Sequence, residues 1–521
     1  MALPPFAPLD VSSYKWHQTS QPGTWERRAC GIENLDGLEL PNKKGHNDFH
    51  ITVTSHFHDQ SLTLDKLTRS IKHVWRRIRF YHPQIACAPL WREGQLFLTY
   101  RDPENDDEVT RWVDRTVNIE LSGKRALEVQ RGLEEKRRAA GSSIQSSDPA
   151  SIYIIPSASM AADKTSSTDV TFLFHLNHIF LDGSGAYTLI GLVLQDLASE
   201  LCSPTERPTS FKWENSVQYL PPPFIEIISP DQHLSGPSFE SALQTALADT
   251  MASQSSWGLK PTGVVNGVAR NEFLVISTIE TDRVKSAARK AGLNITHLAH
   301  AAVFLVGLEA NPPTEGSQRS NIASYFALDD RQYINEKLSQ HRRQYLPNCH
   351  GHGNIKLDNI QEYTLGPRAT PGDIRRKLIA VATKIKDGYD SCARRPCRVS
   401  AGLAFMEMLA GMLAANPNPP DTPMTTPLLI GDGVYDRWIP PEIANPSTKA
   451  PVISNTDVRL YANNYQTFPS FHTWSFRSRC TLSVQFDDGF YTTTDMRNYL
   501  QNLANMLLLF ADGKGSDNSM L

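Results

Sequence analysis

The chain has 521 residues, of which 40% are hydrophobic and 21% charged, and its formal net charge is −3. This length predicts two to four domains, and the composition is that of an ordinary globular protein. Because positive charge is not in excess over the whole chain, neither nucleic acid nor an anionic membrane is an expected partner.

No signal for secretion or membrane insertion is expected from the sequence. The first residues lack a basic segment followed by a long apolar run, and no 18 consecutive residues are apolar. The densest apolar stretch, 298–308, predicts a buried helix. The seven cysteines are odd in number and scattered, which predicts reduced thiols and a cytoplasmic location.

The first 203 residues alternate between strand and helix patterns. Thr63 is a plausible N-cap for a helix that Pro83 ends, and the charged segment 124–145 suits an exposed helix that runs into a loop. The predicted strands are 48–54, 95–100 and 170–177, and the other predicted helices are 64–78 and 186–201.

A proline-rich stretch, 203–236, and a helical pattern at 238–253 separate this half from the second. The second half again mixes strands and helices. Its predicted elements are strands at 273–279, 428–430, 451–454 and 480–486, helices at 282–291, 296–310, 370–385 and 495–510, and a proline-rich separator at 416–427. We therefore expect two α/β domains, 1–203 and 271–521, joined by a crossover connection, 204–270.

Side chains that could take part in catalysis follow the end of one predicted strand. The strand 170–177 runs into His178, Asp182 and Gly183 before the next helix. Because side chains alternate along a strand, His178 is expected on the apolar side and His175 on the other. An imidazole in a dry crevice is a natural base for a hydroxyl proton. Gly183 is expected to supply the backbone freedom of the strand-to-helix turn.

The pattern His178-x-x-x-Asp182-Gly183 resembles the HxxxDG motif of the CoA-dependent acyltransferase superfamily, which includes chloramphenicol acetyltransferase, the plant BAHD enzymes and condensation domains. Segments 327–331 with 353–354, and 452–455, resemble further elements of that superfamily. Within it, segments 173–183 and 431–443 are most similar to the fungal trichothecene 15-O-acetyltransferases.

The resemblance implies an α/β fold of two chloramphenicol-acetyltransferase-like domains with a channel at their interface. His178 would deprotonate an acceptor hydroxyl, which attacks the thioester of acetyl-CoA or another acyl-CoA in a ternary complex, without an acyl-enzyme. Asp182 would form a structural ion pair with Arg331, and Asn455 is a candidate oxyanion donor, with a strand-end turn as its alternative role. The expected acceptor is a hydroxylated secondary metabolite, such as a terpenoid. We expect a monomer without a bound metal.

Two other functions stay open. A condensation-domain-like enzyme would take its acyl group from a carrier protein, although Asn177 replaces the first histidine of the HHxxxDG pattern. A catalytically silent homologue would only bind a ligand. The cluster Cys349-His350-Gly351-His352 lacks a second ligand pair at zinc spacing, so no metal is expected there.

Overall fold

A computed structural model gives the fold of the chain. It describes residues 9–512 apart from 39–47, 140–147, 162–167, 204–210, 265, 314–318, 343, 367 and 416–422. The loop predicted to follow the helix in 124–145 and the first part of the proline-rich segment 416–427 lie outside the described residues.

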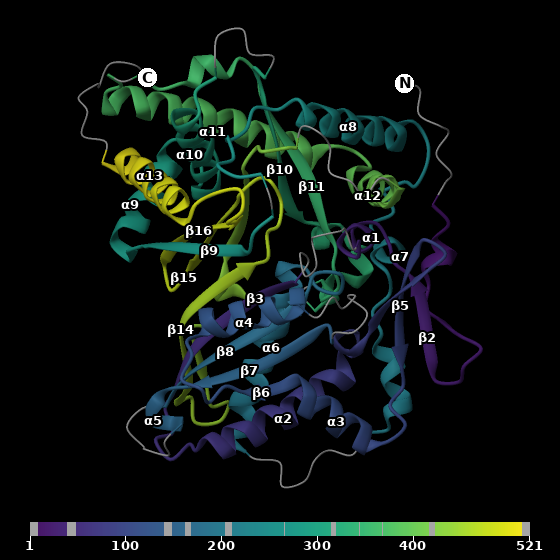
Figure 1. Cartoon of the computed structure of the whole chain (residues 1–521). Coiled ribbons are helices and arrows are strands. Elements are labelled where there is room, and N and C mark those ends of the chain that lie inside the picture. Colours follow the sequence, from purple (N-terminus) through teal and green to yellow (C-terminus); the bar gives the residue numbers. More distant parts are fainter. Residues whose placement is uncertain are drawn as a thin grey trace.

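The larger sheet has six strands in the order β13-β14-β3-β8-β7-β6 (Figure 1). Helices α2 and α6 pack on one face, and α4 covers part of the other. The bounds in the N-terminal half are β3 (Asp48–Phe57), α2 (Leu64–Tyr81), α3 (Asp106–Thr116), β6 (Val117–Ile119), α4 (Ala126–Ala139), β7 (Ala150–Pro156), α5 (Ala158–Ala161), β8 (Asp169–Asn177) and α6 (Gly183–Cys202). A smaller sheet beside it contains β1 (His17–Gln18), β2 (Thr24–Arg28), β5 (Gln95–Arg101) and β4 (Ala88–Arg92).

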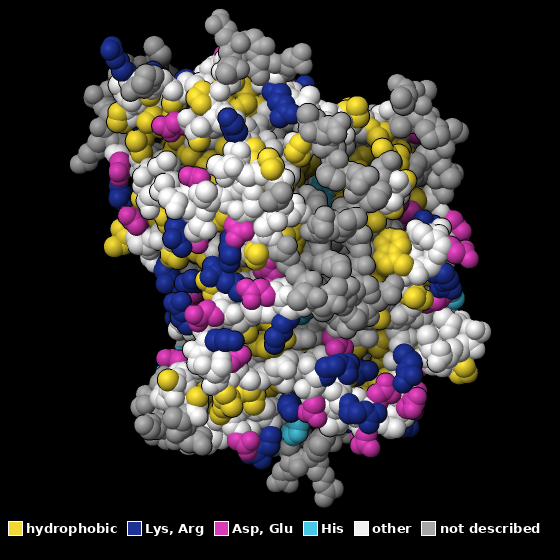
Figure 2. Space-filling model, in the orientation of Figure 1, with side chains coloured by type: hydrophobic (Ala, Val, Ile, Leu, Met, Phe, Trp, Pro, Cys, Tyr) yellow, Lys and Arg dark blue, Asp and Glu magenta, His cyan; other side chains and the backbone are white. Residues whose placement is uncertain are grey.

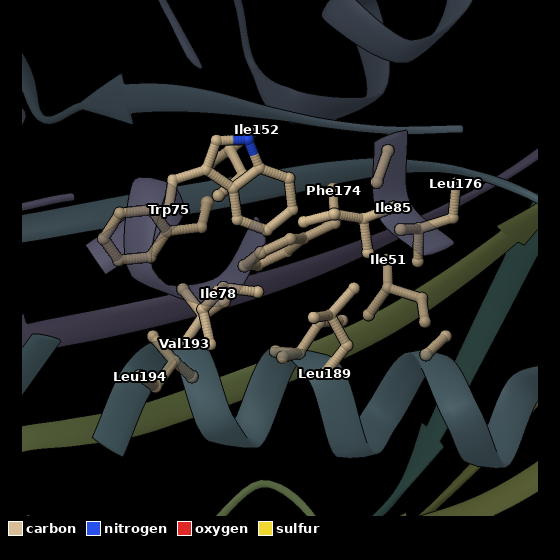
Figure 3. Packing of buried hydrophobic residues seen from close by; sticks show 14 of the residues in the cluster. Ile51, Trp75, Ile78, Ile85, Ile152, Phe174, Leu176, Leu189, Val193 and Leu194 are labelled. Atoms are coloured by element: carbon tan, nitrogen blue, oxygen red, sulfur yellow. The ribbon is translucent and has the colours of Figure 1, made fainter. Parts of the chain in front are cut away.

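Alternation along β8 sorts its side chains between the two faces of the sheet. Phe174 and Leu176 pack into the core against α6, together with Ile51 of β3 (Figure 3). His175 lies on the opposite face, where its ring stacks on that of His50 with centroids 5.0 Å apart. The predicted separation of His175 from the apolar face is therefore confirmed.

The second half builds a four-stranded sheet, β12-β15-β16-β9, and a two-stranded β10–β11 ribbon (Figure 1). Its helices α9, α10, α11 and α13 share one hydrophobic cluster with these strands. The bounds are β9 (Ala269–Ile276), α9 (Thr278–Lys290), α10 (Ile295–Ala310), β10 (Ile322–Asp329), β11 (His350–Leu357), α11 (Pro371–Arg394), β12 (Leu428–Val434), β13 (Glu442–Ala444), β14 (Pro451–Ala462), β15 (Ser470–Phe476), β16 (Arg479–Asp487) and α13 (Thr493–Ala511).

Two late strands, β13 and β14, leave the second half and join the N-terminal sheet, where β14 pairs with β3. The segment before them packs tightly on α6. A Cβ atom on Gly191 would lie 2.0 Å from the carbonyl oxygen of Trp438, and the hydroxyl groups of Tyr187 and Tyr435 are 2.6 Å apart. Residues 435–462 thus belong in space to the first half, while the predicted division of the chain at 204–270 stays a prediction.

The crossover connection holds two helices, α7 (Phe224–Ile227) and α8 (Pro237–Gln254). Helix α8 packs against α12 (Arg398–Ala415), which also contacts α1 (Ile32–Asp36). By length and composition α12 could cross a membrane, but half of its apolar window is buried against these neighbours. We therefore interpret α12 as a core helix.

The strongest sequence patterns are confirmed and three predictions need correction. Thr63 accepts a hydrogen bond from the Lys66 amide and caps α2 as predicted. The helix within 124–145 has the predicted solvated face, at Glu128 and Glu135, but its other face is buried at Gln130 and Glu134. The strand expected at 273–279 ends at 276, and α9 starts earlier than predicted because Ser277 and Glu280 form its capping box. Helix α12 was not predicted.

Charged side chains are mixed on the surface of the molecule. On the face in Figure 2, basic and acidic side chains are interspersed among the residues shown in colour, with no extended patch of one sign. This distribution agrees with the small net charge of −3.

Candidate active site

The turn between β8 and α6 carries His178 and Asp182. Strand β8 ends at Asn177, and Asp182 is the N-cap of α6, where its Oδ1 accepts a hydrogen bond from the Gly185 amide at 2.8 Å. A carboxylate at this place also complements the positive end of the helix dipole. The backbone of the turn is therefore held by Asp182.

The predicted ion pair between Asp182 and Arg331 is present and bidentate. Arg331 donates from its two terminal nitrogens to the two carboxylate oxygens at 2.9 and 2.8 Å. Its Nε donates to the carbonyl oxygen of Tyr345, and the Cys349 amide donates to Asp182 Oδ2. Burial alone would raise the pKa of Asp182, but the Arg331 guanidinium holds it below its ordinary value. The pair thus fastens the turn to segment 345–349.

The expected role of Gly183 in the turn is wrong. Gly183 has no positive φ, and an added Cβ would make only ordinary contacts with Tyr187. The close approach occurs at Gly185 instead, where a Cβ would lie 2.0 Å from the carbonyl oxygen of Leu346 and 3.0 Å from Arg331. A glycine is required at the second of the two positions, because segment 345–349 presses against the first turn of α6.

A carboxylate that the sequence did not reveal faces His178. Asp36, the last residue of α1, places Oδ2 3.2 Å from His178 Nδ1. The His178 side chain is 32% exposed, so its ring remains accessible. Burial would lower the pKa of His178, but the Asp36 carboxylate raises it above its ordinary value. The contact is an ion pair without hydrogen-bond geometry. A proton on Nδ1, facing the carboxylate, leaves the lone pair of the neutral ring on Nε2, the form required of a base.

Asn348 links this pair to the second half of the chain. Its Nδ2 donates to Asp36 Oδ2 at 2.6 Å and to the His178 carbonyl oxygen at 2.7 Å. Its Oδ1 lies 2.7 Å from Nδ1 of His350, whose ring centroid is 5.1 Å from that of His178. Asp36, Asn348 and His350 were not predicted as site residues, since no local pattern connects positions so far apart in the sequence.

A cavity of about 60 Å³ is lined by His350 and His352. The charged residues of its lining form ion pairs with one another, Asp330 with Arg398 and Asp249 with Arg395. The rest of its lining is largely apolar. It comes from β10, β11, α1, α7, α8 and α12, and includes Ile32, Phe224, Ala242, Leu403, Phe405 and Met406.

The oxyanion role expected of Asn455 does not agree with the structure. Asn455 pairs with Ser55 of β3, which in turn pairs with Val170 of β8. Val170 is eight residues from His178, so Asn455 lies roughly 26 Å away along the strands. Its side chain accepts from Ser55 Oγ and donates to the carbonyl oxygen of Pro440. Asn455 holds the bulge in β14.

Comparisons with known proteins agree with this geometry. A family model described as 15-O-acetyltransferase Tri3 matches residues 3–410. Trichothecene 15-O-acetyltransferase TRI3 of Fusarium sporotrichioides is 26% identical over 525 residues, with 98% of each chain covered. Trichothecene O-acetyltransferase TRI3 of Trichoderma arundinaceum is 24% identical over 524 residues, covering 98% of this chain and 99% of the relative.

Solved structures confirm the predicted fold class. The structure of TRI3 from F. sporotrichioides has a TM-score of 0.89 at 24% identity and covers 97% of this chain and 99% of that chain. The first condensation domain of the calcium-dependent antibiotic synthetase has a TM-score of 0.60 at 13% identity, covering 97% and 98%. The fold is therefore mixed α/β with two chloramphenicol-acetyltransferase-like lobes.

Substituting the two glycines of the turn separates their roles. Gly185→Ala should lower the free energy of unfolding by about 1–3 kcal/mol, because the added methyl group overpacks against Leu346. Gly183→Ala should leave it unchanged or slightly higher, since alanine is favoured in a helix. Thermal denaturation of both variants measures the difference, and equal melting temperatures would contradict the assignment.

Breaking the Asp182–Arg331 pair should destabilise the fold. Asp182→Ala removes the buried partner of Arg331 and leaves Asp329, which is 44% exposed, as its remaining carboxylate. This should cost about 3–5 kcal/mol of unfolding free energy in urea denaturation. Asp114→Ala, which removes the exposed pair between Asp114 and Lys72, is the control and should cost at most about 1 kcal/mol. If the two variants unfold at the same urea concentration, Asp182 does not have this structural role.

Proposed function

The chain belongs to the Tri3 15-O-acetyltransferase family and is an acyl-CoA-dependent O-acetyltransferase, and we propose that it acetylates a hydroxyl group of an uncharged terpenoid with His178 as the general base. The observation that carries the proposal is the accessible His178 ring, 3.2 Å from Asp36 and with its centroid 5.1 Å from that of His350, which lines a largely apolar cavity. The acceptor is proposed to be trichothecene-like, because two relatives are named for trichothecene acetylation.

His178 would act through Nε2, the nitrogen that does not face Asp36. Nε2 takes the proton of the acceptor hydroxyl while the oxygen attacks the thioester carbonyl of acetyl-CoA. The tetrahedral intermediate collapses, the carbon–sulfur bond breaks, and the CoA thiolate takes the proton back from His178. Asp36 stabilises the imidazolium that forms between these steps, since a carboxylate 3.2 Å away favours the charged ring. A single transfer in a ternary complex needs no acyl-enzyme.

The cavity lined by His350 supports an uncharged acceptor. Its arginines are already paired with aspartates, so a polyphosphate would find no free positive charge in its described lining. The apolar side chains from α8 and α12 suit a hydrocarbon skeleton. We therefore propose that an apolar part of the acceptor occupies this cavity, whose volume of about 60 Å³ is smaller than a pocket for a whole terpenoid.

Two further parts of the proposal concern the cellular location and the oligomeric state of the protein. All seven cysteines are free, and six of them are buried, which supports a reducing, cytoplasmic environment. A monomer is proposed because the two lobes supply the residues around His178 from one chain, Asp36 from one half and Asn348 from the other.

An acyl-transfer assay tests the proposal. Purified protein with acetyl-CoA and a panel of hydroxylated terpenoids should release CoA and form a monoacetylated product detected by mass spectrometry. His178→Ala should lower turnover by about 10²–10⁴-fold, because the base is lost. Acetylation only from a carrier-protein thioester would instead indicate condensation-type chemistry. Ligand binding without turnover from any donor would indicate a silent homologue.

The pH dependence of turnover tests the contact between Asp36 and His178. Activity should rise as His178 loses its proton, with a midpoint above the ordinary histidine pKa, because Asp36 raises the pKa of His178. Asp36→Asn removes the charge, so the midpoint should move to lower pH and the plateau should fall as the ring loses its orientation. Rates are measured in buffer passed over a chelating resin. An unchanged midpoint in Asp36→Asn would contradict the role of Asp36.

A further inference from the structure

Three potential metal ligands meet at the active site although they are far apart in the sequence. Asp36, His178 and His350 each place one ligand atom within 4.8 Å of the ligand atoms of the other two. They come from the end of α1, the β8–α6 turn and the start of β11. Two imidazoles and one carboxylate form a donor set that suits zinc, cobalt, nickel and copper ions.

We propose that Asp36, His178 and His350 bind one divalent transition-metal ion of the zinc or cobalt class, and that the ion switches off the catalytic base. The nearest ligand atoms, Asp36 Oδ2 and His178 Nδ1, are 3.2 Å apart. This separation is close to the ligand–ligand spacing around a tetrahedral ion with bonds of about 2.0–2.1 Å. All three side chains are partly exposed, which leaves a route for the ion and room for a water ligand.

Asn348 orients two of the proposed metal ligands, Asp36 and His350, through hydrogen bonds. Because its Nδ2 donates to Asp36 and to the His178 carbonyl oxygen, its Oδ1 must be the acceptor toward His350. His350 therefore carries its proton on Nδ1 and a lone pair on Nε2. Such contacts fix the tautomer and orientation of metal-binding histidines.

The proposed metal site differs from the local cluster Cys349-His350-Gly351-His352 considered in the sequence. Cys349 and His352 flank His350 within three residues, but neither belongs to the group of ligands that the described residues bring together. The Cys349 side chain is buried in a hydrophobic cluster with Tyr14 and Phe224, and its amide donates to Asp182. His352 lines the cavity beside His350 and provides a matched control.

Metal binding must block the base whichever nitrogen of His178 it uses. A neutral imidazole has one lone pair, on the nitrogen that carries no proton. Coordination at Nδ1 leaves the proton on Nε2, and coordination at Nε2 occupies the reacting atom. In both cases no lone pair remains for the acceptor hydroxyl. This inhibitory effect rests on the proposed function, whereas binding of the ion does not.

Binding is tested on the full-length protein, freed of metal with a chelator and titrated with cobalt chloride. Calorimetry and the visible absorption of Co²⁺ should report one ion per chain with nitrogen and oxygen ligands. His178→Ala, His350→Ala and Asp36→Asn should each weaken binding by about 100-fold or more, and Asn348→Ala by about 10–100-fold. His352→Ala should bind cobalt as wild type does. Circular dichroism shows that each variant is folded.

The outcomes separate the site from the proposed function. Wild-type affinity in folded His350→Ala and Asp36→Asn, or no saturable binding, would overturn the site. Where acetyl transfer is measurable, zinc chloride should abolish it with the same concentration dependence as binding, and EDTA should restore it. Full activity at saturating zinc would overturn the block of the base. Should no acceptor be acetylated, the cobalt titration still decides whether the site exists.

Discussion

The bidentate contact between Asp182 and Arg331 is the constraint on which the site depends. Both side chains are buried, so each charge is stabilised there chiefly by the other, and Arg331 also contacts the more exposed Asp329. Asp182 also caps α6 and accepts from the Cys349 amide, while Arg331 binds the Tyr345 and Pro347 carbonyl oxygens. One carboxylate thereby ties the β8–α6 turn of the first lobe to segment 345–349 of the second.

Catalytic geometry follows from this connection. Segment 345–349 contains Asn348, whose side chain donates hydrogen bonds to Asp36 and to the His178 carbonyl oxygen. His178, the proposed base, is thus oriented by a carboxylate from α1 and an amide from the other half of the chain. Helix α1 is itself held by α12, which also lines the cavity proposed for an apolar part of the acceptor. Orientation of the base and the shape of the acceptor cavity therefore depend on the same packed elements, so a change in one is expected to affect the other.

Local signals in the sequence predicted much of the fold and only part of the site. The alternation of side chains along strand 170–177 placed His175 on the face opposite the core, and Thr63 predicted the start of α2. The resemblance to a known motif predicted the ion pair between Asp182 and Arg331. Asp36 could not be found, because it lies 142 positions before His178 and only the packing of α1 brings it there. Asn455 was misplaced since its role depended on which strand pairs with β14, a long-range choice that no local pattern records. Gly185 was missed because its constraint comes from Leu346, in the other lobe.

The central claim is that neutral His178 holds its proton on Nδ1, toward Asp36, and keeps Nε2 free as the base. Nitrogen-15 NMR of protein labelled at histidine tests it most directly, with His178→Gln used to assign the signals. In metal-free buffer above the pKa of His178, the account predicts a protonated Nδ1 and an unprotonated Nε2. A proton on Nε2, with Nδ1 bare beside the Asp36 carboxylate, would contradict it.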